Sequence, residues 1–166
     1  MIISVQTFLP DSSFEKSAQV LDRQRLGKQR VEAWQILNCL TGNTAGWKNH
    51  PAVKMWQGYE AALSAYGFFI CSEWIKRGYR DSLLARFIHF NKEMQKKILI
   101  HETDFIWSQL PWWLGNENFH SSHRQTLLSK NFEHYSQFGW EEKPKYQYWW
   151  PIMPMSYTDK KISANA

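Results

Sequence analysis

Two stretches of the chain hold residue types that could do chemistry. The first, FHSSHRQTLLSKNFEHY (119–135), contains His120, His123, Arg124 and Lys130. His120 and Arg124 are four residues apart, so they share one face of a helix. Such a group would suit phosphate contacts or proton transfer. A solvated helix with one packed histidine explains the same residues, and both interpretations stay open.

The second stretch, RQRLGKQRVEAWQIL (23–37), has the period of a helix but places two arginines beside its apolar face. At about 100° per residue, Arg23 and Arg30 fall at the edge of the apolar stripe. That stripe consists of Leu26, Ala33 and Leu37. The far side, where solvated charges are expected, holds Arg25, Lys28 and Glu32.

Two explanations account for the arginines at the edge of the core. Arg23 and Arg30 could pair with a buried acid, such as Glu60 inside the apolar stripe of a helix expected after Pro51. Alternatively, both could line a cavity for an anionic ligand, because the guanidinium fork binds phosphate in a bidentate way and stacks on aromatic rings. His50, just before Pro51, either hydrogen-bonds its own loop or contacts such a ligand.

Other chemistries find less support in the sequence. A metal site could combine His120 and His123 with Glu102 or Asp104, but no second signature accompanies the pair. The chain also lacks a Ser/His/Asp order, a Gly-rich phosphate loop and a dinucleotide fingerprint. We therefore expect neither a metal nor a cofactor.

Composition suits one domain and permits an anionic partner without requiring one. The 166 residues include 20 Lys and Arg against 15 Asp and Glu, for a net charge of +5, which permits binding of nucleic acid or a nucleotide. Most of the ten tryptophans are expected in the core, but a few have polar neighbours, as on surfaces that stack bases. These are Trp112, Trp113, Trp149 and Trp150.

The sequence also predicts a cytoplasmic protein that does not enter a membrane. Cys39 and Cys71 have no metal spacing, which is typical of a reduced intracellular protein. The N-terminal stretch lacks the pattern of a secretory signal, and no apolar run is long enough to span a bilayer.

Hydrophobic period and turn residues predict a mainly α fold: a single compact helical domain over residues 1–158, with a short extended N-terminal segment (3–9) and a flexible tail at 159–166. Gly27 is expected to bend or interrupt the second helix, and Asn91 could break the fourth. The third is expected to run unbroken from Pro51 to about Arg77. The expected helices are 14–21, 23–40, 51–77, 81–100 and 118–130.

Four runs occur in the same order in a known family: RLGKQRVEA (25–33), NHPAVKMW (49–56), KRG (76–78) and SHRQTLLSKNFEHY (122–135). Over most of residues 5–140 the chain resembles the pyrimidine-dimer DNA glycosylases of the endonuclease V type. The likeness is strong to a small bacterial and phage branch and remote to the phage enzyme. It implies a compact helical domain that kinks DNA, extrudes a base and attacks C1′ with its N-terminal α-amine. The resulting Schiff base allows strand cleavage by β-elimination.

The resemblance also implies residue roles. Glu32 would be the assisting carboxylate, Arg25 and Arg30 would contact phosphate or base, and Arg124 with Lys130 would contact the DNA backbone. The reactive amine would belong to Met1, because the bulky Ile2 disfavours removal of the methionine. An α-amine has a reference pKa near 8, so part of it is neutral and nucleophilic at physiological pH.

Two features depart from the family pattern. Met1 lies several residues upstream of the QTFLP segment. Glu32 falls about 160° from Arg30 around an unbroken helix, so the two would share a pocket only if Gly27 breaks it.

Two functions follow as hypotheses. The first is a DNA-repair glycosylase and AP lyase acting on damaged or modified pyrimidines in DNA. The second is a non-catalytic protein that binds or sequesters a nucleotide or another phosphorylated small molecule, such as a phage-type protein that captures a nucleotide signal. The resemblance makes the first the leading hypothesis. Charge is a discriminator between the two, since a wide DNA-binding face should carry more Lys and Arg than a net charge of +5 supplies.

Overall fold

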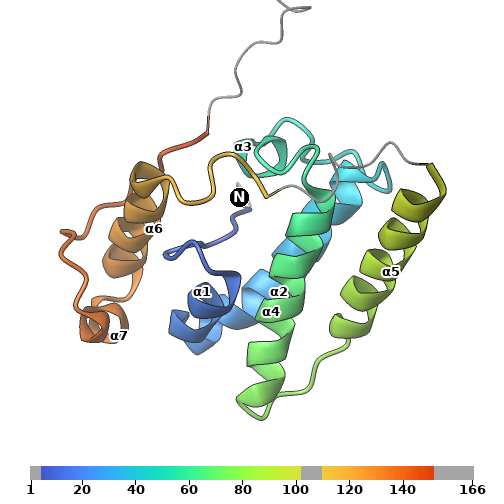
Figure 1. The fold of residues 1–166 in the computed structure, drawn as a ribbon. Helices are drawn as coiled ribbons and strands as arrows, with labels where there is room; N and C mark the ends of the chain where they lie inside the picture. The colour runs from blue at the N-terminus through green and yellow to red at the C-terminus, as the bar shows by residue number, and fades with distance from the viewer. Residues whose placement is uncertain (1–4, 102–109, 152–166) are drawn as a thin grey trace, which may run out of the picture.

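The structure, a computed structural model, describes residues 5–101 and 110–151, with side chains described up to residue 97 in the first range. All regular elements in these ranges are helices, which confirms the mainly α prediction (Figure 1). They are α1 (Phe14–Val20), α2 (Arg23–Leu40), α3 (Pro51–Lys54), α4 (Glu60–Lys76), α5 (Leu84–His101), α6 (Glu117–Lys130), α7 (Phe132–Tyr135) and the 3₁₀ turn η1 (Ser136–Phe138).

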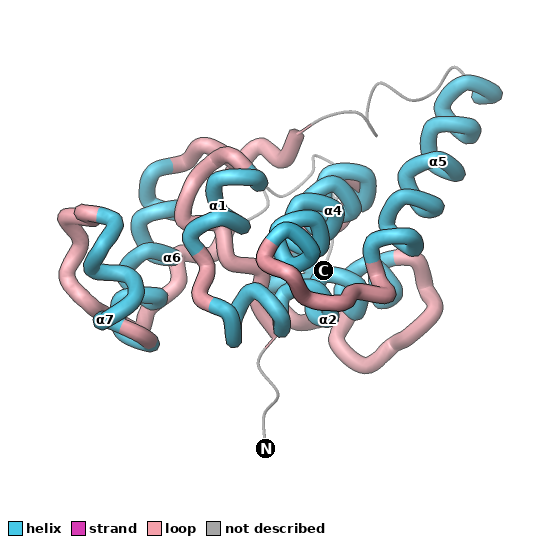
Figure 2. The backbone as a smooth tube through the Cα atoms, turned by 90° about the horizontal axis from the view of Figure 1, so that it is seen from below, coloured by secondary structure: helices cyan, strands magenta, loops and turns pink. Residues whose placement is uncertain are grey.

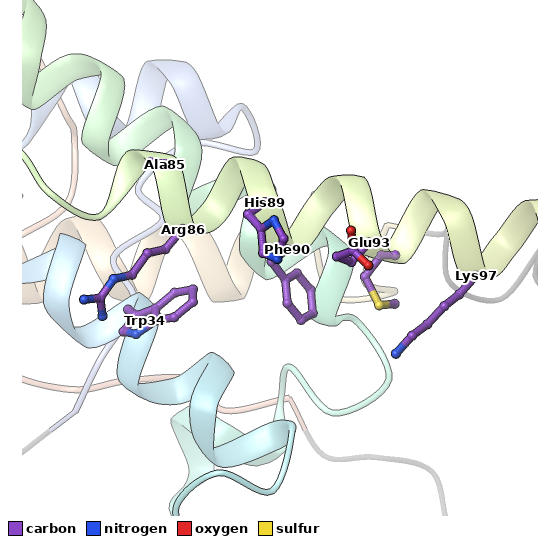
Figure 3. A pocket seen from close by; sticks show the side chains of 8 residues that line it. Trp34, Ala85, Arg86, His89, Phe90, Glu93 and Lys97 are labelled. Atoms are coloured by element: carbon purple, nitrogen blue, oxygen red, sulfur yellow. The ribbon is translucent and has the colours of Figure 1, made fainter.

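Helices α2 and α4 form the centre of the molecule. In both Figure 1 and Figure 2, α6 and α7 lie to one side of this pair and α5 lies to the other. The core between α2 and α4 consists of fully buried apolar side chains, including Leu26, Ala33, Leu63 and Ile70. Among the described side chains of α5, which end at Lys97, the fully buried ring is Phe87, near the beginning of the helix. Further along, α5 leaves a groove against α2 (Figure 3).

Glycines explain two differences from the predicted helices. Helix α2 runs unbroken through Gly27 because this glycine serves packing: a Cβ there would lie 2.9 Å from the Trp74 indole. The single helix expected after Pro51 is wrong. Helix α3 ends at Lys54, and Gly58 turns the chain with a φ of +84° before α4 begins.

Other boundaries agree with the sequence. The Ser13 hydroxyl caps α1 by accepting from the Lys16 amide at 3.2 Å. Gly78, with a φ of +92°, follows the end of α4 as predicted. Helix α5 is continuous through Asn91, so the break considered there does not occur.

Aromatic residues are divided between core and surface. Trp113, expected on a base-stacking surface, is instead fully buried, and its indole N–H donates to the Met55 carbonyl at 2.9 Å. Trp112 is exposed, whereas Trp149 and Trp150 pack in part against the core.

Cys39 and Cys71 are buried free thiols. Within the described ranges, no helix has the length and apolar character needed to cross a bilayer.

Candidate functional site

The N-terminal segment 5–10 runs extended and buried between α2, α4 and α6. Side chains, instead of a neighbouring strand, satisfy its backbone. Gln29 of α2 donates to the Gln6 carbonyl at 2.7 Å and accepts from the Phe8 amide at 2.9 Å. The Tyr66 hydroxyl of α4 donates to the Phe8 carbonyl at 2.9 Å. Buried peptide groups need such partners, so these side chains fix the path of the segment.

Three residues of α6, here called the α6 clamp, hold the end of the same segment: His120, His123 and Arg124. His120 Nδ1 donates to the Leu9 carbonyl at 2.8 Å, and His123 Nδ1 accepts from the Leu9 amide at 2.9 Å. Arg124 donates to the Pro10 carbonyl at 2.8 Å. One turn of helix therefore binds both polar groups of one residue and the carbonyl of the next.

These contacts determine the protonation of the two histidines. His120 Nε2 accepts from the Gly115 amide at 2.8 Å, so its proton is on Nδ1. His123 accepts at Nδ1, which places its proton on Nε2. Burial lowers the pKa of both rings, that of His123 to about 3, so both are neutral at pH 7.

Arg124 is also fully engaged within the protein. Its guanidinium hydrogen-bonds Glu142 at 2.7 Å and pairs with Glu117. The α6 clamp thus differs from a solvated helix with one packed histidine, because both histidines are buried, and each of its three residues bonds the backbone of the N-terminal segment.

A second group of polar residues, the Glu32 site, lies where the N-terminal segment crosses α2: Gln6, Lys28, Gln29 and Glu32. Glu32 is only 5% exposed. Its Oε2 accepts from Gln29 Nε2 at 2.9 Å and more weakly from the Gln6 amide at 3.4 Å, and its Oε1 lies 3.6 Å from Lys28 Nζ. The expectation that Glu32 is solvated is wrong, because the N-terminal segment covers this side of α2.

Burial gives Glu32 an unusual acidity. Desolvation raises the pKa of its carboxyl above the ordinary value, although the charge of Lys28 and the hydrogen bonds from Gln6 and Gln29 oppose the shift. A carboxyl whose pKa is moved toward neutrality can exchange protons with a substrate. Arg30 does not share this site, since α2 is unbroken and directs the two side chains to opposite sides.

Cations gather beside Glu32. Burial lowers the pKa of Lys130, and the like charges of Arg25 and Lys28 lower it further, so the three cations lie within electrostatic reach of one another. Lys130 Nζ lies 4.8 Å from the ring centroid of Tyr146, which is exposed. Among the described side chains, no carboxylate comes within ion-pair distance of Lys130. This surplus of positive charge suits an anionic ligand.

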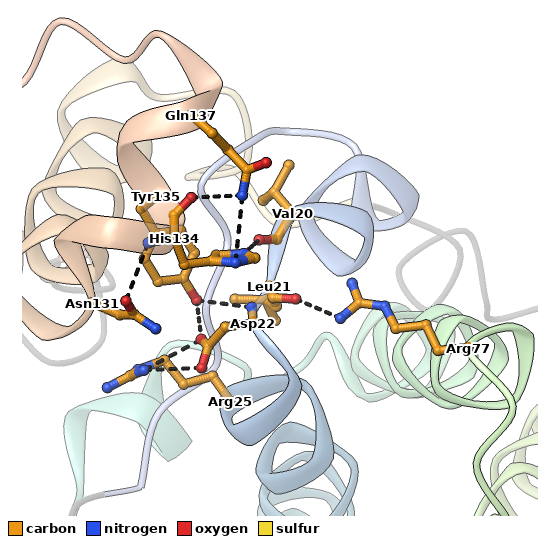
Figure 4. A network of polar contacts seen from close by, with 9 residues as sticks. All are labelled: Val20, Leu21, Asp22, Arg25, Arg77, Asn131, His134, Tyr135 and Gln137. Carbon is orange, nitrogen blue, oxygen red and sulfur yellow. Dashed lines mark hydrogen bonds and ion pairs between the residues drawn. The ribbon is translucent and has the colours of Figure 1, made fainter.

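Helix α7 fixes the turn that leads into α2 (Figure 4). The Tyr135 hydroxyl donates to the Asp22 carboxylate and accepts from the Asp22 amide at 3.1 Å. The same carboxylate holds Arg25 Nη1 at 3.1 Å, and His134 Nε2 donates to the Val20 carbonyl at 2.8 Å. The C-terminal motif therefore positions Arg25 from a distance.

Arg23 and Arg30 lie on another face of α2, each against an aromatic ring. The Arg30 guanidinium is 4.5 Å from the Trp74 ring centroid, and that of Arg23 is 5.0 Å from Tyr79. Arg30 also pairs with Asp81, whose side chain is fully buried. Arg30 thus braces a buried acid as one hypothesis held, but Glu60 as its partner is wrong. Both arginines and Lys28 line a shallow pocket of about 690 Å³.

Glu60 and His50 begin helices. Glu60 accepts from the Gly58 amide at 3.2 Å, and its second oxygen is buried without a hydrogen-bond partner. His50 Nδ1 accepts from the Ala52 amide at 3.1 Å and so caps α3, and burial lowers the pKa of its ring. These contacts give each residue a local structural use.

Some predicted site residues lie outside the described ranges. These are Met1, the predicted source of the reactive amine, and Glu102 and Asp104 of the metal hypothesis. Over the part of the chain that is described, no three His, Cys, Asp or Glu side chains come together as a metal site would require.

Sequence reasoning missed Gln6, Gln29 and Tyr66, which link the N-terminal segment to α2 and α4. A signal for one of them was present. Gln29 and Glu32 are three residues apart, so they share one face of α2, and an amide beside a carboxylate on one helical face is a hydrogen-bonding pair. That this side is covered could not be read from the helix alone.

Comparison with known proteins identifies the family. The family model described as pyrimidine dimer DNA glycosylase matches residues 5–87, half of the chain. This range includes the N-terminal segment, the whole Glu32 site and both arginines that face Trp74 and Tyr79. No curated protein and no solved structure gives a significant match. The chain belongs to the pyrimidine dimer DNA glycosylase family.

Proposed function

We propose that the protein is a DNA glycosylase and AP lyase that acts on damaged pyrimidines. The α-amine of Met1 attacks C1′ of the extruded nucleotide, and the base leaves with the electron pair of the glycosidic bond. Opening of the sugar ring gives a Schiff base. Removal of a C2′ proton then expels the 3′ phosphate and cleaves the strand.

One observation carries this proposal: a buried carboxyl with a raised pKa lies against the first residues of the described chain. Glu32 accepts from the Gln6 amide. Met1 precedes Gln6 by five positions, so the α-amine lies within about 18 Å of Gln6 even in a fully extended chain. In this proposal Glu32 transfers the protons that ring opening and elimination require.

The cations beside Glu32 have a matching role. Arg25, Lys28 and Lys130 contact the phosphates that flank the damaged nucleotide, and Tyr146 offers an exposed ring to a base. The residues of the α6 clamp act indirectly, by fixing the segment that leads to the amine.

Borohydride trapping tests the proposal. The protein is incubated with duplex DNA containing either a pyrimidine dimer or an abasic site, then sodium borohydride is added and the adduct is digested and sequenced by mass spectrometry. We expect a covalent adduct on the α-nitrogen of residue 1. Absence of an adduct together with uncleaved dimer-containing DNA overturns the proposal. An adduct on a lysine would support the lyase activity but would show that a lysine, and not the α-amine, is the nucleophile.

The shallow pocket beside Arg23 and Arg30 favours a second candidate, capture of a nucleotide or another phosphorylated small molecule. Its lining combines cations with the Trp74 ring, as a phosphate joined to a base would require. Calorimetry against a nucleotide panel separates the two functions. Tight binding with the nucleotide recovered unchanged, and weak affinity for DNA, would favour capture.

A further inference from the structure

A groove between α2 and α5 lies apart from the Glu32 site. It has a volume of about 600 Å³ (Figure 3). Glu32 and Trp34 are two residues apart on α2, so their side chains leave the helix about 200° apart. The groove thus opens on the opposite side of α2. The lining residues that matter here are Trp34, Arg86, His89, Phe90, Met94 and Lys97.

The groove exists because, of the α5 side chains described up to residue 97, the fully buried one lies near the beginning of the helix. Phe87 is fully buried against Gly67 of α4, where a Cβ would lie 2.3 Å from the ring. Its ring also packs edge-on against the Trp34 indole, with 5.3 Å between the ring centroids. Beyond Phe87, Phe90 and Met94 are only partly buried, and Figure 2 shows the far end of α5 standing away from the other helices.

The charges around the groove are predominantly positive. The Arg86 guanidinium lies 5.8 Å from the Trp34 ring centroid at one end. Lys97 marks the other end, about 16 Å away along the helix axis. The single carboxylate of the lining, Glu93, is bound by Lys96 at 2.8 Å. The groove therefore has an aromatic floor, a cation at each end and a neutralised acid between them.

This combination matches one class of ligand. An unpaired nucleic acid strand offers flat bases that stack on aromatic rings and phosphates that attract cations at intervals. We propose that the groove binds an unpaired stretch of DNA, with Trp34 and Phe90 stacking on bases and Arg86 and Lys97 contacting the adjoining phosphates. The inference rests on the proposed function for the choice of DNA. The family match does not supply the groove proposal, because the match ends at residue 87 and most residues that line the groove follow it.

The test compares two double variants of the full chain. Arg86→Gln/Lys97→Gln removes both cations of the groove. Lys54→Gln/Lys92→Gln removes the same charge from exposed positions outside it. Fluorescence anisotropy measures the Kd of each for a labelled oligothymidylate at several salt concentrations. We expect the groove variant to bind about tenfold more weakly, with a salt slope lower by about 1.4, because two phosphate contacts are lost. The control should change little.

A second readout concerns stacking. Binding of the oligonucleotide should quench tryptophan fluorescence in the wild type, and Trp34→Phe should reduce the amplitude of that quenching. Equal loss of affinity in both double variants, or no loss in either, overturns the proposal. So does concentration-dependent dimerisation that Phe90→Ala abolishes while oligothymidylate affinity is unchanged, because the groove would then pair two copies of the chain.

The result is distinguishable from failure of the proposed function. If the wild-type protein binds oligothymidylate through the groove but excises no base, the glycosylase proposal is wrong and the groove proposal is retained. If the protein excises bases but its binding of oligothymidylate does not depend on the groove, the glycosylase proposal is retained and the groove proposal is wrong.

Discussion

The Glu32 site and the α6 clamp are both built from buried polar residues, but they differ in what those residues do. Both contact the N-terminal segment, and both contain titratable side chains whose pKa burial has shifted. In the α6 clamp, burial keeps two histidines neutral and their contacts to Leu9 fix the backbone. In the Glu32 site, burial leaves a carboxyl with a raised pKa beside a surplus of cations. Residue type alone therefore does not indicate chemistry. The α6 clamp uses its buried groups to hold the Leu9 and Pro10 backbone, whereas the Glu32 site places a carboxyl of raised pKa beside Lys130.

The sharpest test of this comparison removes one carboxyl at each region: Glu32 itself, and Glu142, which binds Arg124 of the α6 clamp. Glu32→Gln keeps an acceptor for Gln29 and Gln6 but cannot transfer a proton. We expect excision and strand cleavage to fall by about 10²–10⁴, the usual contribution of a general acid or base, with DNA affinity retained. Single-turnover kinetics on dimer-containing duplex measures this.

Glu142→Gln is the matched control, since it removes the carboxylate that Arg124 binds in the α6 clamp. Its excision rate should stay close to that of the wild type. Equal rate losses in the two variants would contradict the assigned division of roles.

The next largest effect should be on stability, from the α6 clamp. His120→Ala leaves the Leu9 carbonyl and the Gly115 amide without their partners. The Leu9 carbonyl is buried, whereas Gly115 is exposed to solvent, so one buried group is left unsatisfied. We therefore expect the free energy of unfolding to fall by about 1–3 kcal/mol. Urea denaturation followed by circular dichroism measures the loss. A variant as stable as the wild type but inactive would move His120 from the structural to the catalytic group.

A pH series examines His123. Its pKa is depressed in the fold, to about 3, relative to an unfolded value near 6.5. Its contribution to stability is therefore present above pH 6.5 and is lost as the pH falls toward 3. By pH 4.5 the resulting loss in the free energy of unfolding should amount to about 2–3 kcal/mol.

His123→Asn provides the reference for that series, because the amide oxygen can still accept from the Leu9 amide and does not titrate. The difference in unfolding free energy between wild type and variant should shrink as the pH falls from 7 to 4.5. A difference that stays constant would mean that His123 does not govern the acid sensitivity.

A smaller effect is expected where the Glu32 site meets DNA. Lys130→Gln removes one of three neighbouring cations, so the affinity for duplex DNA should drop a few-fold and the salt slope by about 1. Titrations at several salt concentrations measure both. Lys16→Gln, at an exposed lysine of α1, is the control; an equal change there would indicate only a general effect of net charge.

The smallest effect has the opposite sign to most substitutions. The raised pKa of Glu32 means that its ionised form is disfavoured in the fold, so this group contributes stability at low pH that is lost as the pH rises through its folded pKa. Glu32→Gln should thus leave stability at pH 7 unchanged or slightly higher, by less than about 1 kcal/mol. Thermal unfolding at pH 7 and pH 5 checks this, and clear destabilisation at pH 7 would contradict it.

The sequence by itself determined the helical class, most helix ends and the family. Apolar residues recur at the helical period, Ser13 and Gly78 have local capping preferences, and the family's runs are contiguous in the chain. These are local properties, so they can be read without knowing what packs against what. The exception is Gly58, where a glycine among polar neighbours ended a helix that the period alone would have continued.

Only the tertiary structure decided which side chains face a ligand. Glu32 looked solvated because a helical wheel shows one apolar stripe, yet the N-terminal segment, 26 residues earlier, covers its polar side. His120, His123 and Arg124 looked like a site because the chain places them together, yet Leu9 and Pro10, more than 110 residues away, take up their hydrogen bonds. Arg30 found Asp81 instead of Glu60 in the same way. Burial and partnership depend on contacts between distant segments, and no local pattern encodes them.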